Sequence, residues 1–215
     1  MPTYIDIHTH QLISEADICI YNLRQQYQTQ YLYPYCSIGI HPWDITLASW
    51  KQQLDELKHY ASLSPVAAIG ECGLDKLCSV DWQLQCTIFA AQVSLANWVK
   101  KPLIIHCVKA FEEVMAILKT EKNQVPVIFH GFNKKQTLAA MLTKKGYYLS
   151  FGGAILKDQH TDSLLSCPLT QLFFETDNNQ YSIHQVYEKA ASLLNIPQAI
   201  LLEEVEHNFN KIITS

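Results

Sequence analysis

The chain has 215 residues, of which 48% are hydrophobic and 17% charged, and its formal net charge is −4. This length supports one hydrophobic core, so a single domain is predicted over residues 1–215. The acidic net charge argues against a protein that binds nucleic acid through its overall charge. Arg24 is the one arginine in the sequence, so bidentate binding of phosphate by arginine is nearly unavailable.

Cysteines and hydropathy narrow the class of protein further. Seven cysteines without a C-x-x-C pair argue against a disulfide framework and a zinc ribbon. The sequence has no apolar run of the roughly 18 residues that a membrane helix needs, and its first residues lack the features of a signal peptide. We therefore expect a cytoplasmic protein with no membrane contact, and no obligate protein partner is inferred.

Short apolar, β-rich runs recur along the chain and predict strands that are buried on both faces. The predicted strands are Thr3–His8, Asp17–Asn22, Tyr35–His41, Val66–Gly70, Leu103–His106, Val125–His130, Tyr147–Phe151 and Leu172–Glu175. Apolar residues at helical spacing predict helices between several of them. The predicted helices are Ser49–Ser62, Asp81–Lys100, Ala110–Thr120, Lys134–Lys145 and His184–Leu194.

Eight strands alternating with helices predict an α/β fold, a single-domain (β/α)8 TIM barrel. A typical barrel of this kind has about 250 residues, so this one is expected to be compact. Only Thr9–Ala16 separates the first two predicted strands. A parallel crossover normally needs about a dozen residues or more, so the first crossover helix is expected to be missing.

The pattern His8-Thr9-His10 stands at the end of the first predicted strand. Side chains two residues apart in a strand point to the same side, so both imidazoles would project together and suit a transition metal. Further metal-binding side chains stand at other predicted strand ends, namely Glu71, His106, His130 and Asp177. Any one of them is more simply a buried polar residue that has found a partner. Six at the same end of separate strands are costly to bury together unless they bind something, which favours a metal site.

The motifs at these strand ends resemble those of the TatD-type metal-dependent hydrolases, the deoxyribonuclease branch of the amidohydrolase-like barrels. They occur in family order and cover nearly the whole chain. The matching stretches are I-D-I-H-T-H at 5–10, G-I-H-P-W at 39–43, A-I-G-E-C-G-L-D at 68–75, P-L-I-I-H at 102–106, I-F-H-G-F at 128–132, S-F-G-G at 150–153 and E-T-D at 175–177.

The resemblance implies two divalent metal ions per chain. His8, His10, Glu71 and Asp177 would hold one ion, and Glu71, His106 and His130 the other, with Glu71 bridging. Mixed nitrogen and oxygen ligands suit Zn²⁺, Mn²⁺, Co²⁺ or Ni²⁺, with Mg²⁺ less natural.

The family also implies the reaction. A metal-activated water is expected to attack a phosphodiester, which makes a deoxyribonuclease acting on DNA or on a small phosphodiester the leading hypothesis. Asp177, as acceptor of the water's proton, and Glu71 are the catalytic candidates.

Three further residues are candidates for substrate binding. The resemblance makes His41 a contact for substrate phosphate, although a purely structural hydrogen bond is an equal alternative. Asp75 would orient His41 or a water, or would simply cap a helix. Lys109 stands near the position where the family usually carries arginine, and a lysine holds phosphate only as a point charge.

Departures from the family pattern fall on substrate contacts. Asn178-Asn179-Gln180 replaces the usual continuation after E-T-D, and Lys76-Leu77-Cys78 replaces the aromatic residues and arginine that often follow G-L-D. Two alternatives therefore stay open. One is a binuclear barrel hydrolase acting on a small-molecule ester, amide or phosphate, and the less favoured one is a non-catalytic descendant of such an enzyme.

Overall fold

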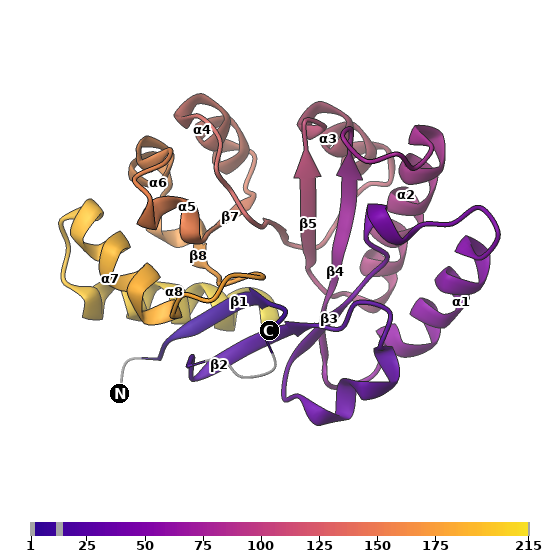
Figure 1. Cartoon of the computed structure of the whole chain (residues 1–215), viewed down its shortest axis with the longest axis horizontal. Coiled ribbons are helices and arrows are strands. Elements are labelled where there is room, and N and C mark those ends of the chain that lie inside the picture. Colours follow the sequence, from indigo (N-terminus) through magenta and orange to yellow (C-terminus); the bar gives the residue numbers. More distant parts are fainter. Residues whose placement is uncertain (1–2, 12–14, 215) are drawn as a thin grey trace. The chain divides into compact units, whose positions relative to one another are not determined.

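The computed structural model describes residues 3–11 and 15–214, and parallel strands alternate with helices along them (Figure 1). The strands are β1 (Ile5–Thr9), β2 (Ile18–Asn22), β3 (Cys36–Ile38), β4 (Val66–Asp75), β5 (Leu103–Val108), β6 (Val127–Phe129), β7 (Tyr148–Phe151) and β8 (Leu172–Phe174). The α-helices are α1 (Trp50–Ala61), α2 (Trp82–Val99), α3 (Phe111–Thr120), α4 (Gln136–Lys144), α5 (Gly153–Leu156), α6 (Thr161–Ser166), α7 (Ile183–Leu194) and α8 (Gln198–Ile213). Short 3-10 helices are η1 (Tyr27–Leu32), η2 (Pro42–Asp44) and η3 (Leu169–Gln171).

Contacts divide the chain into two compact units. Unit 1 comprises Met1–Tyr21 and Ile128–Ser215, and unit 2 comprises Asn22–Val127. Both units contain strands that pair in parallel and in chain order. This succession of parallel strands and helices confirms the predicted (β/α)8 class. The single domain over 1–215 stays a prediction.

In unit 2, β4 lies between β3 and β5, and all ten of its residues are buried. Such a strand reads as a continuous apolar run because both of its faces are covered. Glycine is required where β4 meets β5. A Cβ on Gly70 would lie 2.5 Å from the carbonyl oxygen of Ile104, and Gly73 has φ +144°. This close approach pairs Gly73 with His106 and brings β5 alongside Glu71.

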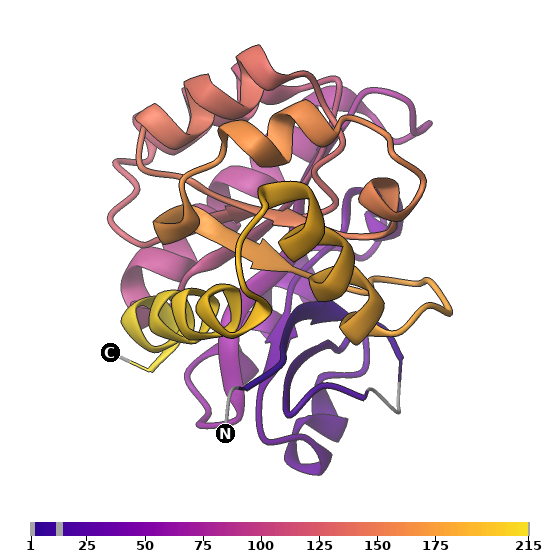
Figure 2. The same ribbon diagram turned by 90° about the vertical axis from the view of Figure 1, so that its left-hand side faces the viewer.

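In unit 1, β7 pairs with β6 and β8, and β1 pairs with β2. A parallel bridge from Thr9 to Asp177 links the end of β1 to the segment after β8. Figure 2 shows α7 and α8 in front of strand β8, with α4 and α6 following along the same side. Buried apolar residues at helical spacing on α8, such as Leu201, Leu202, Val205 and Phe209, explain this packing.

The predicted strands and the five predicted helices all correspond to observed elements, with shifted ends. One prediction needs correction, and some of the observed helices are absent from the predictions. Strand β4 runs five residues beyond Gly70, so Glu71 lies within the strand and does not follow it. The helices α5, α6 and α8 were not predicted, although α8 is 16 residues long. The described residues between β1 and β2, which are 10–11 and 15–17, contain no helix, as expected, and 12–14 lie outside the described residues.

None of the helices in the described part of the chain has the length and apolar character needed to cross a membrane.

Candidate functional site

Two histidines and one aspartate form a compact group at the end of β1 in unit 1. Nε2 of His8 and Nε2 of His10 each lie 3.6 Å from the same carboxylate oxygen, Oδ1 of Asp177. The imidazole of His8 is fully buried, whereas the side chains of His10 and Asp177 keep 16% and 31% of their surface exposed. Both histidines of the H-x-H pattern therefore face one carboxylate, while their role as metal ligands stays a prediction.

Backbone hydrogen bonds hold Asp177 at this place. Its N–H donates to the carbonyl of His8 at 3.0 Å, and the N–H of His10 donates to the carbonyl of Asp177 at 3.1 Å. Asp177 has φ +52°, a conformation that aspartate and asparagine adopt more readily than most residues. The carboxylate is therefore positioned by the strand that carries the two histidines.

A buried polar chain beneath Asp177 fixes the E-T-D segment. Asp6 accepts hydrogen bonds from the N–H of Thr176 at 3.1 Å and from its hydroxyl at 2.6 Å, and the hydroxyls of Thr176 and Thr9 lie 2.9 Å apart. Burial raises the pKa of Asp6 to about 7, although the hydrogen bonds from Thr176 oppose that shift. These hydrogen bonds connect the segment after β8 to β1.

His130, directly after β6, belongs to the same unit. Its ring centre lies 4.3 Å from that of His8, and its Nδ1 lies 3.4 Å from Oε1 of Glu175. Glu175 is 1% exposed, and Gly131 donates its N–H to Oε1 at 2.8 Å. Oε2 of Glu175 is buried with no hydrogen-bond partner in the described structure. Sequence reasoning missed Glu175, although the first letter of the E-T-D motif was a signal for it.

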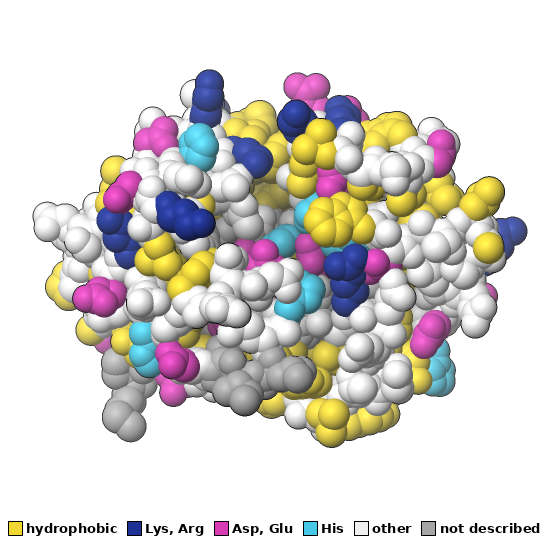
Figure 3. Space-filling view, in the orientation of Figure 1, with side chains coloured by type: hydrophobic (Ala, Val, Ile, Leu, Met, Phe, Trp, Pro, Cys, Tyr) yellow, Lys and Arg dark blue, Asp and Glu magenta, His cyan; other side chains and the backbone are white. Residues whose placement is uncertain are grey.

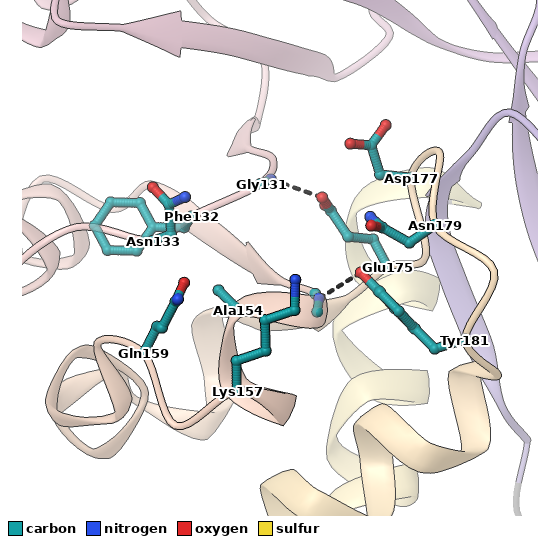
Figure 4. Close-up of a pocket in the computed structure, with 12 residues that line it drawn as sticks. Gly131, Phe132, Asn133, Ala154, Lys157, Gln159, Glu175, Asp177, Asn179 and Tyr181 are labelled. Carbon is teal, nitrogen blue, oxygen red and sulfur yellow. Dashed lines mark hydrogen bonds between the residues drawn. The ribbon is translucent and has the colours of Figure 1, made fainter.

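A polar pocket of about 240 Å³ opens beside Glu175 and Asp177, within unit 1. Figure 4 shows the side chain of Lys157 reaching into it, with the amides of Asn133 and Gln159 on the far side. Tyr181 closes one wall, and its hydroxyl accepts a hydrogen bond from the N–H of Gly153. The pocket lining therefore combines the carboxylates of Glu175 and Asp177 with the ammonium group of Lys157 and several side-chain amides.

A second group in unit 2 is built around Glu71, which is 6% exposed. Its Oε1 lies 3.2 Å from Nε2 of His41 and 2.9 Å from Nδ1 of His106. Its Oε2 accepts a hydrogen bond from the amide of Asn22 at 3.2 Å, and its N–H donates to Asn22 Oδ1 at the same distance. Asn22 therefore sets the orientation of this carboxylate, a role that the sequence does not reveal.

The imidazole of His41 has a defined tautomer. Its Nδ1 accepts the N–H of Trp43 at 3.1 Å, so the ring proton is on Nε2 and faces Glu71. Burial lowers the pKa of His41, and Glu71 only partly opposes this shift. His41 is consequently neutral near pH 7, and it joins the Glu71 group directly.

Asp75 lies on the other side of His106 in the same unit. Its Oδ2 is 3.4 Å from Nε2 of His106 and accepts the indole N–H of Trp43 at 2.7 Å, while Oδ1 accepts the N–H of Leu77 at 2.7 Å. Burial acts to raise the pKa of Asp75, but the hydrogen bonds from Trp43, Leu77 and His106 hold it below its usual value. A carboxylate thus faces each ring nitrogen of His106.

Lys109 does not join these contacts. It follows β5 with φ +53°, is exposed, and has no ion-pair partner among residues 3–11 and 15–214. Its part in substrate binding stays a prediction.

These donor sets fit divalent transition metals. Ligand atoms lie within 4.8 Å of one another in the sets His8–His10–Asp177 and His130–Glu175–Asp177 of unit 1, and in the set His41–Glu71–His106 of unit 2. Acceptor oxygens outnumber the ring nitrogens around His106, because the carboxylates of both Glu71 and Asp75 face it. A cation would compensate such a surplus of lone pairs, and the unpartnered Oε2 of Glu175 supports the same interpretation.

Positive charge is not concentrated around these groups. On the face drawn in Figure 3, lysine and arginine side chains stand at several separate places and do not form one basic stripe. Arg24 is committed to an ion pair with Asp44, in which its Nη2 lies 2.5 Å from Oδ1. This distribution agrees with the net charge of −4.

Comparisons with known proteins identify the family to which the sequence is similar. The family model described as TatD related DNase matches residues 13–214. An uncharacterized metal-dependent hydrolase of Bacillus subtilis, YabD, is 33% identical over 157 residues, covering 69% of this chain and 60% of that protein. The 3'-5' ssDNA/RNA exonuclease TatD of Citrobacter rodentium is 28% identical over 200 residues, covering 86% of this chain and 75% of that protein.

Solved structures give the same fold. YjjV, a TatD homologue from Escherichia coli, superimposes with a TM-score of 0.84 at 20% identity, covering 99% of this chain and 98% of that one. A TatD family hydrolase from Entamoeba histolytica gives a TM-score of 0.83 at 16% identity, with 99% of both chains covered. The chain spans less than two thirds of the length of the first curated relatives it matches, with 60% and 55% aligned.

Proposed function

Because this chain belongs to the TatD-related DNase family, we propose that it is a divalent-metal-dependent hydrolase that cleaves phosphodiester bonds of DNA. The observation that carries the proposal is the gathering of imidazole nitrogens and carboxylate oxygens into sets within 4.8 Å. Their residues lie in the second half of a strand or just beyond its end, which is where (β/α)8 barrels build active sites.

The proposed ligand sets follow the family pattern. His8, His10, Glu71 and Asp177 would hold one ion, and Glu71, His106 and His130 would hold the other. The neighbouring carboxylate of Glu175 and the imidazole of His41 are additional donors that the structure brings to these groups. When bound, divalent ions at such a site supply Lewis-acid chemistry, since they make water more acidic and offset phosphate charge.

Asp177 is the proposed acceptor of the proton of the attacking water. Its carboxylate is partly exposed, while its backbone is fixed between His8 and His10. Attack on phosphorus forms a new phosphorus–oxygen bond and breaks the bond to the leaving sugar oxygen. Proton acceptance by a positioned carboxylate is a general-base role, and its position beside both histidines supports it.

The pocket beside Asp177 is the proposed place for the substrate group next to the scissile phosphate. Lys157 would offer its ammonium group to a phosphate oxygen, and Asn133 and Gln159 would hydrogen-bond polar groups of the nucleotide. His41 and Asp75 are proposed to orient the substrate from the Glu71 group, with Lys109 as a further phosphate contact.

A second candidate is hydrolysis of a small-molecule ester, amide or phosphate with the same metals. It is favoured by the lack of a basic stripe on the face in Figure 3 and by the ion pair that occupies Arg24. A long nucleic acid is usually held by several phosphate contacts, whereas a small substrate needs few.

The test is a substrate profile of the purified protein with Mn²⁺, Mg²⁺ or Zn²⁺. The proposal predicts cleavage of single-stranded DNA and of bis-p-nitrophenyl phosphate. Turnover of p-nitrophenyl acetate or a phosphate monoester alone would favour the second candidate. No turnover by protein that has been measured to contain metal would point to a non-catalytic descendant.

A further inference from the structure

Trp43 is an exposed aromatic residue held beside the Glu71 group, and the reaction proposed above leaves it without a role. We propose that it is a stacking platform for one unpaired nucleobase of the substrate, next to the scissile phosphate. This inference rests on the proposed phosphodiesterase function and deepens it, since it assigns a base-binding residue to the site.

The indole is fixed by the candidate site itself. Its Nε1 donates to Oδ2 of Asp75 at 2.7 Å, and its backbone N–H donates to Nδ1 of His41. Its ring centre lies 4.9 Å from that of His41 and 5.8 Å from that of His106, with both pairs edge-on. A base stacked on this ring would therefore sit within a few ångströms of two proposed metal-site residues.

Packing alone does not account for this arrangement. Trp43 is 56% exposed, so more than half of a large apolar ring faces water even though its polar atom is satisfied. A ring fixed in one orientation and left exposed loses little conformational entropy when a ligand stacks on it. Both properties are those of a preformed binding surface.

Arg24 supports one part of the ring. Its guanidinium carbon lies 5.8 Å from the Trp43 ring centre, and Asp44 holds that guanidinium in place. The guanidinium lies over the indole, and its charge is offset by the ion pair with Asp44. Arg24 therefore packs against the ring and is not available to bind a phosphate. The remaining exposed surface of the ring is available for a base.

Stacking of this kind predicts a substrate with accessible bases. Every base has a π-face, so an aromatic platform binds single strands with little sequence preference. In a duplex the bases are stacked on one another, and taking one out costs a few kcal/mol. The platform therefore predicts faster cleavage of single strands than of the same sequence in a duplex.

The decisive experiment combines variants of Trp43 with substrates that lack one base. Trp43→Gln removes the ring and keeps a side-chain N–H donor, whereas Trp43→Phe keeps a ring and loses the donor. Trp98→Gln is the matched control, because Trp98 is a 70% exposed tryptophan near the end of α2 in the same unit. The substrates are single-stranded oligonucleotides, intact or with one abasic sugar at a position flanking the cleaved bond.

We expect Trp43→Gln to lower kcat/KM for the intact strand by roughly tenfold, mainly through KM. Trp43→Phe should stay within about threefold of the parent, and Trp98→Gln should match it. An abasic sugar at one flanking position should lower the kcat/KM of the parent by the same factor. The same abasic sugar should not lower the kcat/KM of Trp43→Gln any further. Two results would overturn the inference. One is that Trp43→Gln loses the same factor in kcat/KM, relative to the parent, on the intact strand and on every abasic strand. The other is that Trp43→Gln loses no kcat/KM at all.

A binding measurement separates this inference from the proposed function. Single-stranded oligothymidylate is added to the chelated protein and tryptophan fluorescence is recorded. Quenching that is lost in Trp43→Phe but kept in Trp98→Phe supports the platform even if no phosphodiester is cleaved. Cleavage by a protein whose quenching and kcat/KM do not depend on residue 43 leaves the proposed function standing and removes the platform.

Discussion

Asp177 is hydrogen-bonded through its backbone to His8, and its carboxylate also faces the imidazole of that residue. The N–H of Asp177 donates to the carbonyl of His8 at 3.0 Å, and Oδ1 lies 3.6 Å from Nε2 of the same residue. His10 completes the arrangement by donating its N–H to the carbonyl of Asp177 at 3.1 Å. The distance between these candidate ligands is thus set by main-chain bonds and does not depend on side-chain packing alone.

Asp177→Asn should remove turnover and leave the fold intact. The backbone bonds do not involve the carboxylate, and asparagine tolerates the positive φ of this position. Loss of a general base is expected to lower kcat by about 100- to 10,000-fold. Rates on bis-p-nitrophenyl phosphate, with circular dichroism and metal content as controls, check this. Near-parental turnover would remove Asp177 from the mechanism.

Thr176→Val should destabilise the protein through the polar chain below the site. The variant removes the hydroxyl that donates to Asp6 and leaves that buried carboxyl short of a partner. A cost of about 1–3 kcal/mol in the free energy of unfolding is expected. Thr87→Val is the control, because Thr87 is exposed and its hydroxyl bonds only Gln83 in its own helix. Equal stabilities of the two variants would contradict the assigned role of Thr176.

The buried carboxyl of Asp6 should make stability depend on pH in metal-free protein. Its folded pKa of about 7 lies above the ordinary value of 3.8, so the folded state binds the proton more tightly. Protonated Asp6 therefore stabilises the folded state. This contribution to the free energy of unfolding is largest below pH 3.8 and is lost as the pH rises to about 7. Asp6→Asn imitates the protonated form and should flatten this dependence. Denaturant unfolding across that range checks it, with Asp55→Asn, at an exposed aspartate, as control.

Removal of metal should lower the melting temperature, because an ion that binds only the folded state stabilises it. Saturation at a hundred times Kd contributes about 2.7 kcal/mol, which corresponds to roughly 5–10 °C for a chain of this size. Glu71→Gln should lose most of this increment, since Glu71 faces both His41 and His106. Thermal scans with chelator and with Mn²⁺ or Zn²⁺ measure it. An unchanged increment in Glu71→Gln would exclude Glu71 as a ligand.

Sequence alone predicts most of the fold because the information is local. Buried parallel strands read as apolar runs, and their ends carry His8, His10 and Asp177 in recognisable motifs. Helix α8 carries buried apolar residues at helical spacing as well, although it is not among the predicted helices.

What the sequence did not reveal depends on tertiary contacts. Asn22 lies 49 positions before Glu71, the residue whose carboxylate it orients. The residues next to Asn22 in the sequence do not indicate this hydrogen bond. The indole of Trp43 meets Asp75 across 32 positions for the same reason. Such partners meet only when distant segments of unit 2 fold against one another, and a single sequence does not show which segments these are.

Activity as a function of added metal tests the central claim most directly. Chelated protein is titrated with Mn²⁺ while the cleavage of single-stranded DNA is followed, and bound metal is counted in parallel. The account predicts no turnover without metal and a rate that rises until about two ions are bound per chain, as expected of a two-metal site. Turnover that survives complete chelation, or a fully loaded protein that cleaves no phosphodiester, would contradict it.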